Sequence, residues 1–97
     1  MYASLSITIP IPEKRDEFIK VVEQRLIGLL KETKGFKNAV LFSDEERNEY
    51  GSLILWETKE DCDAYVKSMR EGGAKLTSPL TAGMLFRPRT FYVNYSF

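Results

Sequence analysis

The sequence of 97 residues contains no histidine and only one cysteine, Cys62. Without histidine the chain cannot build a His-ligated zinc or haem site, a Ser–His–Asp triad or a histidine acid–base pair. A lone cysteine cannot form a disulfide within the chain, which fits a reducing compartment. We therefore expect no tightly bound metal or haem, and no cofactor.

The chain also lacks an excess of charge and a long apolar run. Lys plus Arg and Asp plus Glu each number 14, so the formal net charge is zero. Nothing in this balance attracts nucleic acid, whose binding depends on neutralising phosphates. No apolar run approaches bilayer length, and the chain starts with strand-like alternation rather than a signal peptide. We expect a cytoplasmic protein with neither nucleic-acid nor membrane partners.

Alternation and helical periodicity predict the first half of the chain. Residues 5–11 alternate apolar and polar side chains, which is typical of a half-buried strand. Pro12 is suited to the first turn of a helix over about 13–33, where Gly35 follows as a left-handed cap. The apolar stripe of this helix is predicted to consist of Phe18, Val21, Val22, Leu26, Leu29 and Leu30.

A hairpin and a second helix are predicted next. Strands over about 36–43 and 50–58 flank the polar turn 44–49. Thr58 can cap the amide of Asp61, whose carboxylate can reach back, in a variant of the capping box. The apolar stripe of the helix comprises Cys62, Tyr65, Val66 and Met69, and Gly72-Gly73 end it.

The remaining residues predict a short turn over 78–84 and a last strand over about 89–97, which alternates cleanly. The order β-α-β-β-α-β is the split βαβ pattern. The predicted fold is therefore α+β and ferredoxin-like, with a four-stranded antiparallel sheet and two helices on one face. We expect one domain over 1–97.

The two hairpin strands indicate a partner. Residues 39–42 and 53–56 are apolar at consecutive positions, so both faces of each strand carry apolar side chains. Two helices cover only one face of a small sheet, and soluble monomers rarely expose a large apolar patch. We expect a homodimer that packs sheet face against sheet face, although a long loop could cover that face instead.

Several short motifs resemble the antibiotic biosynthesis monooxygenase family of dimeric α/β-barrel domains. They are Gly35-Phe36 at the start of the second strand, the segment Trp56-Glu57-Thr58-Lys59-Glu60-Asp61, and Ala64-Tyr65 after it. The resemblance covers nearly the whole chain. It implies a dimeric α/β barrel with a pocket between the sheet and the helices of each subunit.

The resemblance also implies candidate chemistry. Some members oxidise polycyclic phenols or quinol-like carbon acids with dioxygen and no metal or flavin, whereas others degrade haem. Haem degraders use a histidine on the second helix as the iron ligand, but this chain has Lys67 and Ser68 in that region and no histidine. The resemblance therefore favours a cofactor-independent monooxygenase acting on a small aromatic or quinol-like metabolite.

Such an enzyme needs an aromatic-lined pocket and donors for an enolate or phenolate. Trp56, at the position of the family's tryptophan, could stack on a planar substrate and donate its indole N–H, or simply pack in the core. Asn38 shares a strand face with apolar neighbours, so its amide could be partly buried and would then bind a ligand or backbone. We take these two residues as the catalytic candidates.

The substrate-binding candidates are Tyr65, Arg87, Tyr92 and Asn94. Tyr65 lies on the stripe of the second helix, and Arg87 could bind an anionic oxygen. Each of the four also has a plain structural or surface role as the alternative. Cys62 lies near a helix N-terminus, which can lower a thiol pKa, but its apolar stripe favours an inert buried thiol.

Two other classes of function remain open. One is a non-catalytic dimeric module that binds a small hydrophobic ligand or only associates. The other is an isomerase or decarboxylase on the same scaffold, because a fold does not determine a function. The absence of histidine weakens every acid–base interpretation and so favours the module.

Overall fold

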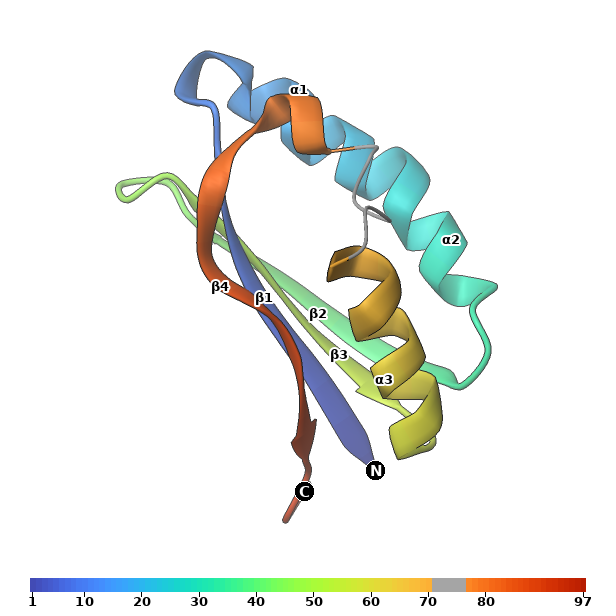
Figure 1. The fold of residues 1–97 in the computed structure, drawn as a ribbon. Coiled ribbons are helices and arrows are strands. Elements are labelled where there is room, and N and C mark those ends of the chain that lie inside the picture. The colour runs from blue at the N-terminus through green and yellow to red at the C-terminus, as the bar shows by residue number, and fades with distance from the viewer. Residues whose placement is uncertain (71–76) are drawn as a thin grey trace.

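Helices cover one face of a four-stranded antiparallel sheet in the computed structural model of the chain, which describes residues 1–70 and 77–97 (Figure 1). The strands are β1 (Tyr2–Pro10), β2 (Phe36–Asp44), β3 (Glu49–Trp56) and β4 (Thr81–Tyr92), in the spatial order β2-β3-β1-β4. β1 is antiparallel to both β3 and β4, and β2 to β3. The predicted ferredoxin-like α+β fold is confirmed.

One long helical rod follows β1. It begins as a 3-10 turn η1 (Pro12–Lys14) and continues through α1 (Arg15–Val21), the π-helical turn η2 (Val22–Leu26) and α2 (Ile27–Lys31). The sequence predicted this rod and its start at Pro12, but it did not predict the π turn. Gly35 follows with a φ of 83°, the left-handed conformation expected of the cap.

The π turn decides which side chains face the sheet. Four residues advance an α-helix by roughly 40° more than a full turn, so a stripe at this spacing drifts by about 120° over twelve residues. The wider π turn offsets much of this drift and keeps Phe18, Val22, Leu26 and Leu30 on one face. Leu29, which we had placed on the stripe, is instead 53% exposed.

The second helix, α3 (Lys59–Ser68), begins as predicted. The Thr58 hydroxyl accepts from the Asp61 amide at 3.1 Å and donates to the Asp61 carboxylate at 2.9 Å. Cys62 and Val66 are buried on its inner face. The predicted stop at Gly72-Gly73 lies outside the described residues.

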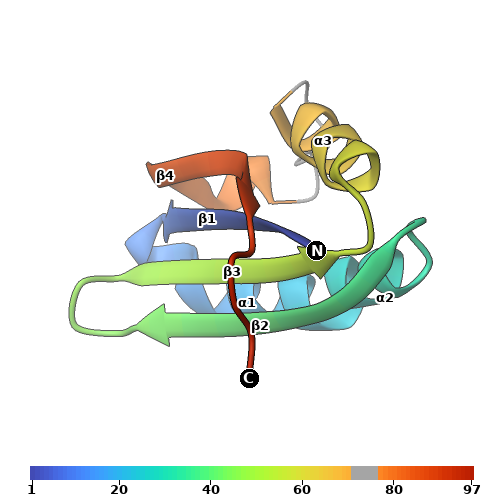
Figure 2. The same ribbon diagram turned by 90° about the horizontal axis from the view of Figure 1, so that it is seen from below.

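The C-terminal predictions need correction. The turn predicted over 78–84 is only the 3-10 turn η4 (Ser78–Leu80), and β4 runs from Thr81 to Tyr92 rather than over 89–97. Three register shifts against β1 break the alternation in β4 that would have indicated a strand. Pro88 is tolerated because β4 lies at the sheet edge. After Tyr92 the chain leaves β4, and in the view of Figure 2 its C-terminal end crosses in front of β3 and β2.

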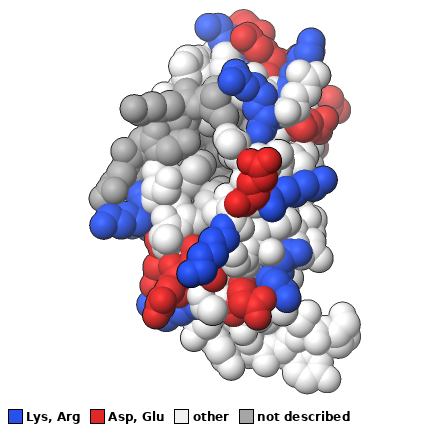
Figure 3. Space-filling view, turned by 90° about the vertical axis from the view of Figure 1, so that its right-hand side faces the viewer, with Lys and Arg blue, Asp and Glu red and all other residues white. Residues whose placement is uncertain are grey.

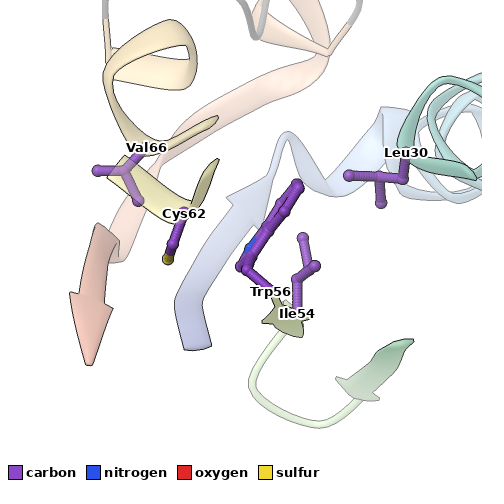
Figure 4. Close-up of a cluster of buried hydrophobic side chains, with 5 residues drawn as sticks. All are labelled: Leu30, Ile54, Trp56, Cys62 and Val66. Carbon is purple, nitrogen blue, oxygen red and sulfur yellow. The ribbon is translucent and has the colours of Figure 1, made fainter. Parts of the chain in front are cut away.

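The main core cluster lies between β3, α2 and α3. Trp56 and Ile54 of β3 lie between Leu30 on one side and the α3 residues Cys62 and Val66 on the other (Figure 4). Trp56 and Cys62 are fully buried. A second cluster joins Phe18 and Val22 to Tyr50 and Leu80.

No helix in the described part of the chain is long and apolar enough to cross a membrane. On the side that carries the helices, basic and acidic side chains are interspersed (Figure 3).

Two glycines, one after the helical rod and one inside it, provide a matched pair of substitutions. A Cβ at Gly35 would collide with the Asp61 side chain and would sit at a positive φ, so Gly35→Ala should lower the free energy of unfolding by roughly 1–3 kcal/mol. Gly28 lies in α2, where an added methyl group would meet nothing within 4 Å, and Gly28→Ala should raise it by about 0.5–1 kcal/mol. Urea denaturation of both variants measures the difference, and equal effects would contradict this account.

Candidate functional site

A cavity of about 220 Å³ lies between the sheet and the helical rod. Phe18, Val22, Leu26 and Leu30 of the rod form its apolar roof. Its floor comes from the central strands, including Ser6, Thr8, Tyr50, Ser52 and Ile54. Tyr65 of α3, Met69 just after it, and Met84 and Pro88 of β4 complete much of the wall.

The floor depends on which face of β1 meets the helices. Ser6 and Thr8 line the cavity, and Ser4 is buried in the core, so the polar side chains of β1 face the helices. Successive side chains of a strand point to opposite faces, so Leu5, Ile7 and Ile9 lie on the helix-free face. The alternation predicted a half-buried strand but not which of its two faces the helices cover.

The polar groups of the described lining are uncharged hydroxyls. Ser6 and Ser52 are cross-strand partners, and their hydroxyl oxygens are 3.0 Å apart. Six further residues of the described lining carry hydroxyls, namely Thr8, Tyr50, Tyr65, Thr77, Ser78 and Thr81. No lysine, arginine, aspartate or glutamate is among the described residues that line the cavity. The described lining can therefore donate and accept hydrogen bonds, but none of its side chains offers a compensating charge.

The two lining tyrosines stay protonated well above neutral pH. Burial, with a smaller effect from Cys62, raises the pKa of Tyr65 to about 12. Burial, with a smaller effect from Glu23, raises the pKa of Tyr50. Both can donate a hydrogen bond near neutral pH, but neither serves as a base there.

Trp56 takes the packing role that we had weighed against catalysis. It is fully buried, donates its indole N–H to the Ser4 hydroxyl at 3.1 Å, and is not among the described lining residues. Its ring centroid lies 4.9 Å from that of Tyr65, which does line the cavity. Trp56 therefore supports a wall residue from behind.

Asn38 is exposed and not partly buried as expected. We had placed Asn38 on the same strand face as its apolar neighbour Phe36. A register shift between these two residues puts them on opposite faces, and Phe36 packs against the core cluster. Asn38 pairs with Leu55 and alternates with Ala39, which packs against the core, so it lies on the helix-free face.

The other substrate-binding candidates lie away from the cavity. Arg87 and Asn94 are exposed, and Asn94 follows the end of β4. Tyr92 is 62% exposed and packs edge-on against Tyr2, with ring centroids 5.4 Å apart. Of the six predicted site residues, the structure brings only Tyr65 to the described lining.

Sequence reasoning missed Ser6, Thr8, Tyr50 and Ser52. The available signal was a run of small hydroxyl residues at alternate positions of β1 with a serine in the neighbouring strand, which we had not interpreted as part of a site. Cys62 is fully buried, and burial raises the pKa of its thiol, as an inert cysteine requires. No cluster of potential metal ligands occurs within the described residues.

The raised pKa of Tyr65 predicts a loss of stability at high pH. Between pH 10 and 12 the unfolded chain releases this proton while the folded protein retains it, so the free energy of unfolding should fall by roughly 2–3 kcal/mol over that window. Tyr65→Phe should remove this part of the decline. Urea unfolding of both proteins at pH 9 to 12 measures it, and parallel curves would contradict the assignment.

The comparisons with known proteins agree with this architecture. The putative antibiotic biosynthesis monooxygenase of Chloroflexus aurantiacus J-10-fl has a TM-score of 0.71 at 15% identity, covering 99% of this chain and 95% of that one. A second protein so described, from Nitrosomonas europaea, has a TM-score of 0.74 at 11% identity, covering 98% and 100%.

A protein of unknown function from Nitrosomonas europaea, NE2512, has a TM-score of 0.78 at 8% identity, covering 99% and 91% of the two chains. At these identities the likeness concerns the fold. No curated protein matches the chain. The family model for antibiotic biosynthesis monooxygenase, however, matches residues 3–70, so the chain belongs to the antibiotic biosynthesis monooxygenase family.

Proposed function

We propose that the cavity binds a small, uncharged aromatic or quinol-like metabolite, and that the protein oxygenates this metabolite with dioxygen without a cofactor. The observation that carries the proposal is the composition of the cavity, which combines an apolar roof with a floor of hydroxyl groups. Such a site suits a ring that carries a few oxygen atoms. Membership of the family supports the same type of chemistry.

The volume and charge of the cavity narrow the ligand. A cavity of about 150 Å³ in another protein binds benzene, so about 220 Å³ suits one or two fused rings. Burying a charged ligand without a partner would be strongly unfavourable. Because the described lining carries no charged side chain, the bound form is neutral.

In the proposed reaction a methylene carbon beside a conjugated carbonyl loses a proton to water. The resulting carbanion reduces dioxygen and combines with it to give a carbon-bound peroxide anion. This anion takes up a proton and becomes a hydroperoxide. Loss of one water leaves a new carbonyl, so one oxygen atom stays on carbon and the other leaves as water. The Ser6–Ser52 pair and Tyr65 would donate hydrogen bonds to the enolate oxygen.

The second candidate is a non-catalytic module that binds the same kind of ligand. The observation that favours it is the lack of a base among the described lining residues, since both tyrosines there have raised pKa values. An isomerase or decarboxylase would need proton transfer even more directly, and we do not propose one. If the protein is an oxygenase, the substrate must be acidic enough to lose its proton to water without a base from the described lining.

Oxygen consumption distinguishes these candidates. Wild-type protein should consume oxygen with a neutral two-ring carbon acid such as 1,3-dihydroxynaphthalene, whose keto tautomer carries the required methylene group, and less with the larger anthrone. The double variant Ser6→Ala/Ser52→Ala, or Tyr65→Phe, should lower turnover by about a hundredfold because a donor to the oxyanion is lost. Tyr92→Phe, an exposed tyrosine outside the cavity, is the matched control for Tyr65→Phe.

Substrate binding without oxygen uptake would favour the module. Uptake that is unchanged in both cavity variants would show that the chemistry occurs elsewhere. Circular dichroism must show that each variant is folded.

We also propose that two copies of the chain associate through the helix-free sheet face. This face carries aliphatic and aromatic side chains from all four strands, namely Leu5, Ile7, Ile9, Val40, Phe42, Leu53, Leu55, Phe86 and Phe91. Val40 is 55% exposed and Phe42 41%. A second copy of the same sheet would bury this surface with matching chemistry.

Two local contacts on this face support a sheet-to-sheet contact. The Phe42 ring lies over Gly51, where any Cβ would collide with it, so the ring packs down onto the strand. Arg89 lies over the rings of Phe86 and Phe91, with its guanidinium carbon 5.2 and 4.9 Å from their centroids. The aromatic rings thus hold this cation against the surface.

Light scattering at micromolar concentration should give about twice the chain mass of 11.2 kDa. Val40→Asp should yield the monomer, because it places an unpaired charge in the interface. Leu29→Asp is the matched control, since Leu29 is equally exposed but lies on α2. A soluble wild-type monomer, or dissociation by both variants alike, would contradict the interface.

A further inference from the structure

A groove of about 500 Å³ lies between α2 and α3, on the outer side of the cavity wall. Its lining includes Leu29, Thr33 and Lys34 from the end of the rod, and Glu60 and Ala64 from α3. Leu26, Leu30, Tyr65 and Met69 line both the groove and the cavity. These four side chains are the partition between the two spaces.

We infer that the ligand reaches the cavity through this groove, past the four-residue partition. The inference rests on the proposed binding in the cavity. The floor of the cavity is a hydrogen-bonded sheet, which cannot open without breaking the ladder between β1 and β3. At another point of the wall, Phe18 and Tyr50 are locked edge to face with ring centroids 5.4 Å apart.

The partition is built differently. It consists of single side chains, whose rotamers exchange far faster than strands separate. Met69 is unbranched and adapts readily to a passing ligand. Leu26 lies in the π turn and Leu30 one helical turn later, and these are the two side chains that the rod contributes to the partition.

Within the partition, the position of the Tyr65 ring is restricted by the Trp56 side chain. Its ring rests against Trp56 at 4.9 Å, and Trp56 is held by its bond to Ser4 and by complete burial. Tyr65 therefore cannot swing toward Trp56, and its movement is directed to the side of the cavity and the groove. No described residue accepts or donates a hydrogen bond to its hydroxyl, so no such bond holds the ring shut.

Three tryptophan substitutions at exposed positions test the route. Ala64→Trp places a bulky ring in the groove, and Ser78→Trp places one at the cavity wall beyond the groove. Lys67→Trp lies on α3 outside both linings and is the control. The probe is 1-naphthylamine, an uncharged two-ring aromatic amine of the size that the cavity suits, followed by its own fluorescence in stopped-flow mixing.

An obstruction at an entrance slows arrival and departure equally, whereas a change in the site alters the equilibrium. Ala64→Trp should therefore lower the association and dissociation rates by the same factor, about tenfold, and leave Kd within about twofold of wild type. Lys67→Trp should leave both rates close to those of wild type, whereas Ser78→Trp, at a residue of the cavity lining, should change Kd rather than lower both rates by one factor.

Wild-type rates in Ala64→Trp, or an equal lowering of both rates at unchanged Kd in Ser78→Trp instead, would overturn the route while leaving the proposed function intact. A change confined to Kd in Ala64→Trp would make the groove part of the binding site and would also overturn the route. Failure of every protein to bind the probe would overturn both this inference and the proposed cavity.

Discussion

Much of the structure depends on one residue: the Trp56 side chain is buried, and its indole N–H therefore needs a hydrogen-bond acceptor inside the protein. A buried indole N–H without a partner would be costly, and the Ser4 hydroxyl at 3.1 Å provides that partner. The bond links β3 to β1, while the ring packs between α2 and α3. Tyr65 rests on the same ring, so the cavity wall depends on this contact.

Small polar side chains on the helix-facing side of β1 explain why a cavity exists at all. A strand that turned Leu5 and Ile7 toward the rod would bring large side chains to the space that Ser6 and Thr8 now border. Hydroxyl residues are smaller and leave room under Phe18, Val22 and Leu26. The same choice sends the aliphatic side chains to the helix-free face, so the proposed ligand site and the proposed dimer interface have one origin.

Family membership and chemistry are separate conclusions for this protein. Its structural relatives share the fold at 8–15% identity, and one of them is itself of unknown function. A shared backbone does not transfer a reaction, because the reaction depends on a few side chains. Here the polar side chains of the described cavity lining are hydroxyls, and none of the described lining residues is a base. The proposed oxygenation would therefore require a substrate that is acidic enough to lose its proton to water.

Local signals in the sequence determined the order of the helices and strands, the Thr58 cap and the turn at Gly35. They also showed that both faces of the hairpin strands carry apolar side chains. Each of these features depends on residues only a few positions apart. Only the tertiary structure decided which face of β1 meets the helices, because a period of two shows that the faces differ but not which one is covered. The π turn, the extent of β4 and the location of Trp56 behind the cavity wall likewise depend on packing between distant segments. For that reason the resemblance to the family implied a pocket between the sheet and the helices, but only one of the predicted site residues lies in its described lining.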